Sequence, residues 1–129
     1  MYGGSNNIAK IPSTIGNLTK LEEIFLYSNK IVELPKSIGN LVYVTRIEFD
    51  SNKIKVLPDE FGNLVNLEII DFSYNSIERL PDVFGNMVNL RSVDFSHNKI
   101  TNIPFSLENS KIKYLLLNNN LINDTLKNS

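Results

Sequence analysis

Acidic side chains recur at one fixed spacing in this chain, and they are its clearest candidates for chemistry. Glu48, Asp71 and Asp94 lie 23 residues apart, and Phe25 and Leu116 hold the corresponding places on either side of them. Carboxylates brought into one row repel one another and attract a positive charge. The spacing therefore indicates an acidic strip with an apolar residue at each end, suited to a basic group of a partner.

Two arginines offer an alternative explanation for the strip. Arg46 and Arg91 are close enough in the pattern to offset the repulsion without any partner. The sequence leaves open whether these arginines or a basic partner balances the charge.

Catalytic chemistry has little support in these residues. His97 is the only histidine and there is no cysteine, so a two-histidine or thiolate metal site and a conventional serine triad with spare histidines are not expected. Neither glycine-rich phosphate-binding motif occurs. We expect no enzyme, no cofactor and no metal.

The elements that position the acidic strip follow from a repeat. All five prolines, from Pro12 to Pro104, lie 23 residues apart, and asparagines recur six residues before the last four of them. A period of this length is typical of a solenoid. Alternating apolar residues open each unit, which predicts short strands at about 24–26, 47–49, 70–72, 93–95 and 115–117.

The rest of each unit predicts a turn and a short helix. The recurrent asparagine can hydrogen-bond the backbone where the chain bends, and the Leu-Pro pair after it fixes an extended step. The stretch from the proline to the next Gly-Asn-Leu has room for only a 3₁₀ or single α turn. Apolar residues at the repeated positions, including two columns of phenylalanine, form the expected core.

The aligned units, such as LEEIFLYSNKIVELPKSIGNLVY, share L-x-x-L-x-L-x-x-N-x-I-x-x-L-P-x-x-I-G-N-L. This pattern resembles the leucine-rich repeat family, and its 23-residue form is similar to intracellular Ras-group and Roco-type repeats. The resemblance implies an α/β repeat fold: a right-handed solenoid with a curved parallel sheet on its concave face and short 3₁₀ or α turns on its convex face. We expect one domain over 1–129, with a partial repeat at 1–20, full repeats at 21–43, 44–66, 67–89 and 90–111, and a partial terminal repeat at 112–129.

The resemblance also implies a non-catalytic module that binds a protein or peptide on the concave face. The alternative is a structural or dimerisation segment of a larger signalling protein with a separate kinase or GTPase domain. Exposed strand positions carry many aromatic and charged residues, which are enriched in binding hot spots. The candidate partner-binding residues are Phe25, Tyr27, Arg46, Glu48, Asp50, Ile69, Asp71, Tyr74, Asp94, His97, Tyr114 and Leu116.

Composition narrows the partners. The chain has 129 residues, 42% of them hydrophobic, and a formal net charge of −1 without a basic cluster, so we expect no nucleic acid and no membrane as partner. No secretory signal is recognisable, which favours the cytoplasm, although a secreted protein whose signal was removed also fits. The leucine-rich strand near 112–117 has no complete unit behind it, and residues 123–129 are too short and polar to cover it, so self-association through that edge is possible.

Overall fold

A computed structural model describes residues 1–122, and part of the predicted terminal repeat, residues 123–129, lies outside the described residues. The sheet contains five parallel strands in chain order. They are β1 Glu23–Phe25, β2 Arg46–Glu48, β3 Ile69–Asp71, β4 Ser92–Asp94 and β5 Tyr114–Leu116. Among the described residues, no helix is long and apolar enough to cross a membrane.

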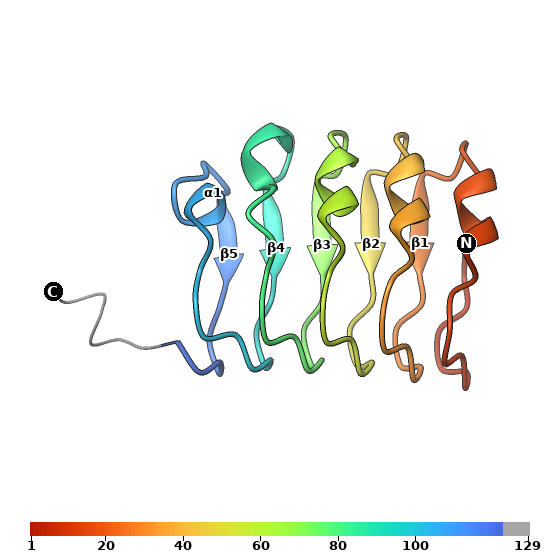
Figure 1. Cartoon of the computed structure of the whole chain (residues 1–129), viewed down its shortest axis with the longest axis horizontal. Coiled ribbons are helices and arrows are strands. Elements are labelled where there is room, and N and C mark those ends of the chain that lie inside the picture. Colours follow the sequence, from red (N-terminus) through yellow and green to blue (C-terminus); the bar gives the residue numbers. More distant parts are fainter. Residues whose placement is uncertain (123–129) are drawn as a thin grey trace, which may run out of the picture.

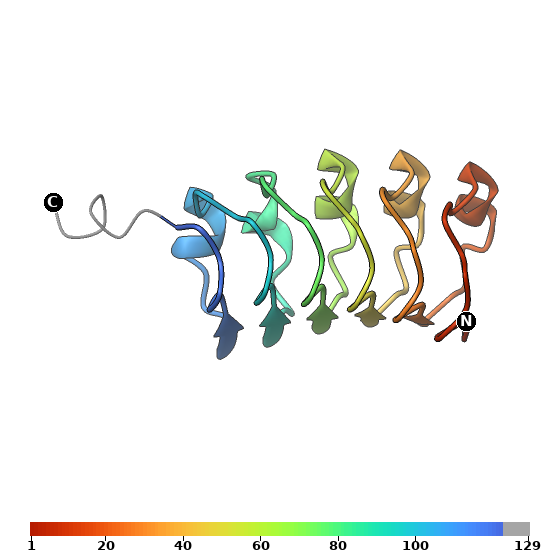
Figure 2. The same cartoon turned by 90° about the horizontal axis from the view of Figure 1, so that it is seen from below.

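The helical turns lie on the opposite side of the array from the strands (Figure 1). They are η1 Ser13–Asn17, η2 Lys36–Asn40, η3 Asp59–Asn63, η4 Phe84–Asn86 and α1 Phe105–Glu108. Most follow a proline with φ near −70°, such as Pro35, as the sequence predicts. Seen from below, the turns are spread more widely than the strands, which places the sheet on the inner, concave side (Figure 2).

The strands begin and end one residue earlier than predicted. β1 starts at Glu23 rather than Ile24, and the same shift applies to the other four strands. The buried Leu26 still donates a backbone hydrogen bond to Glu48, but beyond Phe25 the chain already bends toward Ser28, whose φ is 53°. The apolar pattern located the buried side chains correctly and misplaced the strand ends.

The predicted core is confirmed. The inward residue of β1 to β4 is fully or almost fully buried, and Phe49, Phe61, Phe72 and Phe95 have no exposed surface. The two phenylalanine columns interlock, because the Phe72 ring lies 5.5 Å from Phe49, 5.7 Å from Phe61 and 5.9 Å from Phe95. Burial of these rings fixes the stacking of successive repeats.

A ladder of asparagines supports the turn that follows each strand. Each side-chain oxygen accepts a hydrogen bond at 3.0 Å from a backbone nitrogen of the preceding repeat, as Asn52 does from Ile31. Each side-chain nitrogen donates to carbonyls of its own repeat and of the preceding one, as Asn52 does to Phe49 and Leu26. The members of the ladder are Asn29, Asn52, Asn75, Asn98 and Asn120. This arrangement satisfies buried backbone groups that would otherwise lack partners.

The N-terminal segment extends the sheet beyond β1. Phe25 donates a backbone hydrogen bond to Met1, and Gly3 donates one to Phe25, both at 2.8 Å. Tyr2 forms a parallel bridge with Phe25. The first partial repeat therefore covers the edge of β1 with backbone pairing.

Candidate concave binding surface

The solvent-facing, concave side of the sheet is its outer face, and the candidate strand residues from the sequence lie on it. In each of β1 to β4 the middle side chain is buried and its two neighbours are half-buried. The register places Phe25 beside Glu48, Glu48 beside Asp71, and Asp71 beside Asp94, with Leu116 next. The predicted strip therefore crosses all five strands, with its acidic residues on β2, β3 and β4.

A second column lies along the starts of the same strands. Arg46 pairs in register with Glu23 and Ile69, and Ser92 pairs with Tyr114. Ile69 is half-buried between its neighbours. This column brings one cation and one aliphatic side chain to the outer face.

Three carboxylates on this face, those of Glu48, Asp71 and Asp94, already have partners. Arg46 lies 3.3 Å from Glu48 Oε1. Asp71 Oδ1 accepts hydrogen bonds from the Ser73 amide at 2.9 Å and the Ser73 hydroxyl at 2.6 Å. Asp94 Oδ1 accepts the same pair from Ser96, also at 2.9 and 2.6 Å. The strip is stabilised within the chain mainly by serines, which sequence analysis did not consider.

The alternative in which Arg91 helps to neutralise the strip does not hold. Its Nε lies 3.6 Å from Oε1 of Glu68, and both residues precede their strands, β4 and β3. The side chain therefore lies at the starts of the strands. Only Arg46 offsets the acidic charge from within the residues that the structure describes.

Asp50 lies just beyond the end of β2, and it differs from these three carboxylates. No side chain among residues 1–122 forms a hydrogen bond or salt bridge with its carboxylate, although the Asn52 side chain donates to its backbone carbonyl. Burial is the largest cause and raises the pKa of the Asp50 carboxyl. The negative charges of Asp71, Glu48 and Asp94 raise that pKa further, and a hydrogen bond with the backbone amide of Asp50 lowers it in part. The charged form of Asp50 is therefore less favourable than that of an exposed, isolated aspartate.

Aromatic side chains cover the N-terminal end of the face. Tyr2 stacks on Phe25 with ring centroids 5.0 Å apart, and the Arg46 guanidinium lies 5.5 Å from the Phe25 ring. Tyr27 lies against Gly4, where an added Cβ would come 2.5 Å from its ring. Tyr2 was missed by sequence analysis, although its position 23 residues before Phe25 was a usable signal.

A second aromatic pair lies in the turns that follow the C-terminal ends of β3 and β4. The rings of Tyr74 and His97 stack with centroids 4.1 Å apart and planes 7° apart. His97 Nε2 lies 3.2 Å from Asn119 Nδ2. At the far end of the sheet, Tyr114 and Leu116 are about half exposed. The candidate residues thus form an acidic centre bordered by aromatic and apolar groups.

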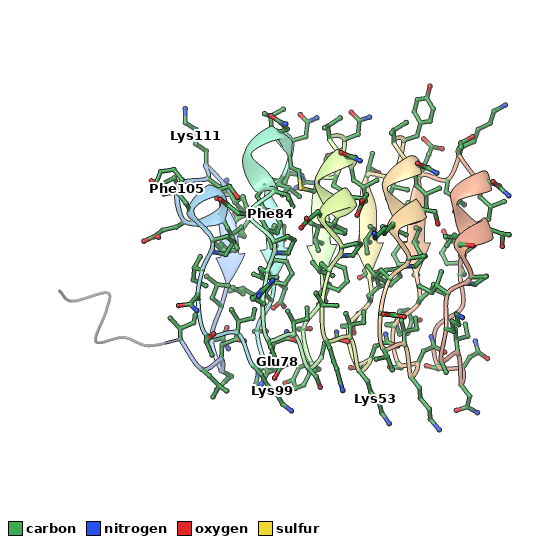
Figure 3. The ribbon with its side chains drawn as sticks, viewed as in Figure 1. Lys53, Glu78, Phe84, Lys99, Phe105 and Lys111 are labelled. Carbon is green, nitrogen blue, oxygen red and sulfur yellow. The ribbon has the colours of Figure 1, made fainter. Side chains whose placement is uncertain are left out.

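A separate hollow of about 330 Å³ lies on the convex side between η4 and α1. Phe84, Met87 and Ile112 contribute to its lining, and Phe84, Phe105 and Lys111 are labelled in this region (Figure 3). Its serines are engaged internally: the Ser106 hydroxyl accepts a hydrogen bond from Phe84, and that of Ser110 donates one to Leu107. Within residues 1–122, no group of three or more histidine, cysteine or acidic side chains could hold a metal ion.

Family profiles described as leucine-rich repeat match residues 20–41 and 43–100, which together span more than half of the chain. The chain belongs to the leucine-rich repeat family. A search of curated protein sequences finds no significant match to this leucine-rich repeat protein.

Solved structures share its fold over most of its length. A leucine-rich repeat protein of Leptospira interrogans has a TM-score of 0.86 and 29% identity, covering 95% of this chain and 32% of its own. The plant peptide hormone receptor RGFR1 in complex with RGF2 has a TM-score of 0.82 and 28% identity, covering 91% and 20%. The leucine-rich repeat ectodomain of the Arabidopsis thaliana receptor kinase GASSHO1/SCHENGEN3, in complex with CASPARIAN STRIP INTEGRITY FACTOR 2, has a TM-score of 0.80 and 31% identity, covering 89% and 15%. This repeat protein thus spans about a third or less of each of these chains.

Proposed function

We propose that this repeat protein is a non-catalytic interaction module whose concave face binds an extended protein or peptide segment with a basic centre. The observation that carries the proposal is the continuous concave face of β1 to β5, where Glu48, Asp71 and Asp94 lie between Phe25 and Leu116. Two of the similar structures are complexes of plant receptors with named partners. Charge complementarity would favour a basic segment and speed its association.

The size of the sheet indicates which residues must take part. Five strands about 4.8 Å apart and about 10 Å long give an area of about 240 Å², far below the ~800 Å² per partner of a standard interface. A partner must therefore also contact residues beyond the strand ends. Tyr27, Asp50, Tyr74 and His97 are the predicted candidates there.

The test begins with peptides selected for binding from a random library on the immobilised protein. The double variant Asp71→Asn and Tyr114→Ser should weaken their binding by about tenfold or more while the melting temperature stays nearly constant. The matched control is Lys30→Gln with Lys53→Gln on the adjacent rim, which should leave affinity unchanged. The proposal is refuted if peptide affinity falls when Lys30 and Lys53 are replaced but stays unchanged in the Asp71 and Tyr114 double variant.

A second candidate function is self-association through β5. Tyr114 and Leu116 are about half exposed, Leu121 is 63% exposed, and no strand among residues 1–122 pairs with the outer edge of β5. Unpaired edges are templates for pairing with another chain. Sedimentation velocity at micromolar concentration should show dimers that Leu116→Lys abolishes, whereas a monomer at all concentrations would exclude this function.

The Leu-Pro pairs at 34–35, 57–58 and 80–81 and the Ile-Gly-Asn-Leu segments at 15–18 and 38–41 support placing the protein with cytoplasmic Ras-group or Roco-type repeats, beside a kinase or GTPase domain. Fractionation of cells that express the full open reading frame tests the compartment, and the reading frame itself tests for the catalytic domain. Recovery from the secreted fraction would contradict the cytoplasmic assignment.

A further inference from the structure

The Tyr74 ring occupies a place where the other repeats have small or polar residues. The residue before each recurrent asparagine has a left-handed backbone, with φ between 53° and 58°. The six residues at this place are Ser5, Ser28, Ser51, Tyr74, His97 and Asn119. Bulky residues are uncommon at positive φ. Tyr74 therefore departs from the pattern in both size and chemistry.

Only one face of the Tyr74 ring is covered by a neighbouring ring. His97 stacks on that face at 4.1 Å, and Asn119 is within hydrogen-bond distance of His97 on its far side. In the preceding repeat the same place holds Ser51, whose hydroxymethyl group is too small to cover the other face. Tyr74 is accordingly 58% exposed. The ring is therefore accessible to a flat group of a partner.

A carboxylate without a cationic partner in the described part of the chain belongs to the repeat that precedes Tyr74. Asp50 directly precedes Ser51, and the Ser51 amide donates to the Ser73 carbonyl at 2.9 Å, so Asp50 is one strand spacing from the segment that ends in Tyr74. Its carboxylate has no cationic partner among residues 1–122. The nearby Lys53 and Lys99 extend outward along the rim of the array (Figure 3). The flat group that fits here is therefore a cation.

We propose that an arginine of the bound segment stacks its guanidinium on the uncovered face of Tyr74 and pairs with the Asp50 carboxylate. The inference rests on the proposed function and specifies which side chain the partner must carry. Guanidinium is planar, stacks on aromatic faces and bonds carboxylates through two N–H groups. The ammonium of lysine is a compact point charge that lacks the stacking surface.

The experiment titrates the 129-residue protein with N-acetyl-arginine amide and follows the NMR signals of Tyr74 and Asp50. Saturable shifts at both residues are expected in the millimolar range, with N-acetyl-lysine amide binding about fivefold more weakly. Tyr74→Ser, which restores the residue type of Ser51, and Asp50→Asn should each weaken arginine binding by about fivefold or more. Tyr43→Ser, which removes an exposed tyrosine outside the strands, is the matched control and should bind as the parent does.

The outcomes separate this inference from the proposed function. Selected peptides that bind the concave face but lack arginine, or keep full affinity for Tyr74→Ser, overturn the arginine site and leave the binding module intact. Arginine-amide shifts at Tyr74 and Asp50 without any peptide binder support the site and refute the module. Equal shifts with the lysine amide, or shifts unaffected by both substitutions, overturn the arginine site.

Discussion

The side-chain oxygen of Asn52 accepts a hydrogen bond from the backbone nitrogen of Ile31 at 3.0 Å, joining two repeats through a side chain. The same amide donates to the Leu26 and Phe49 carbonyls, and the residue is 8% exposed. Removing one member of a buried hydrogen-bonded set leaves its partners unsatisfied. The ladder is therefore a stabilising element as well as a repeat marker.

Asn52→Ala should lower the free energy of unfolding by about 1–3 kcal/mol, because buried backbone groups lose their partners. Asn66→Ala is the matched control, since Asn66 is exposed and donates a single bond to Val42. It should change stability by less than about 0.5 kcal/mol. Urea melts of both variants measure these free energies. An equal loss of stability in the two variants would contradict the buried structural role of Asn52.

Asp71→Asn should be neutral or stabilising, because it removes a central charge while an amide oxygen can still accept the two bonds from Ser73. Asp71→Ala removes both bonds and should cost about 1 kcal/mol. Urea melts compare the two variants. If Asp71→Asn proves the more damaging, the charge is stabilising and the interpretation of the strip is wrong.

Asp50→Asn should stabilise the protein at pH 7, since burial and neighbouring carboxylates raise the folded-state pKa of Asp50 above 3.8. A raised carboxyl pKa means that the folded state binds more protons, so the destabilisation from Asp50 is full above the folded pKa and fades as pH falls toward 3.8. The stability difference between variant and parent should shrink over that window in pH-dependent urea melts. If the stability difference instead grows as the pH falls, the folded-state pKa of Asp50 is lowered rather than raised.

Gly62→Ala and Gly85→Ala should differ in sign. A Cβ at Gly62 would lie 2.6 Å from Val83 Cβ and 2.8 Å from its carbonyl oxygen, whereas one at Gly85 meets nothing within 4 Å. Overpacking at Gly62 should cost about 1–3 kcal/mol. Neither glycine has positive φ, so Gly85→Ala should gain up to about 1 kcal/mol by restricting the unfolded chain. Thermal melts of the two variants test this prediction. A similar loss of stability in both would contradict the free space beside Gly85 in η4.

Ser106→Ala should raise the pKa of Asp82. Hydrogen bonds from the Ser106 hydroxyl and amide hold that pKa below 3.8, and the amide lies 2.9 Å from Asp82 Oδ1. The substitution removes the hydroxyl, which has the larger effect, and keeps the amide. NMR titration of the Asp82 carboxyl should show a partial return toward 3.8, and an unchanged pKa would exclude the hydroxyl as its cause.

The sequence by itself determined the repeat, the fold class, the buried columns and the structural role of the recurrent asparagines. Each depends on residues that return every 23 positions, so one local solution is copied along the chain. Phe72 packs against Phe49 and Phe95, for example, because equivalent residues of adjacent repeats must stack.

The tertiary structure alone decided which hydrogen bonds, salt bridges and ring contacts are made by the residues that differ between repeats. Arg91 pairs with Glu68 rather than the acidic strip, the Ser73 hydroxyl donates to Asp71, and burial beside other carboxylates raises the pKa of Asp50. Tyr74 stacks on His97 from a left-handed backbone position. Such choices depend on rotamers and on strand spacing across the array, so no spacing along the chain encodes them.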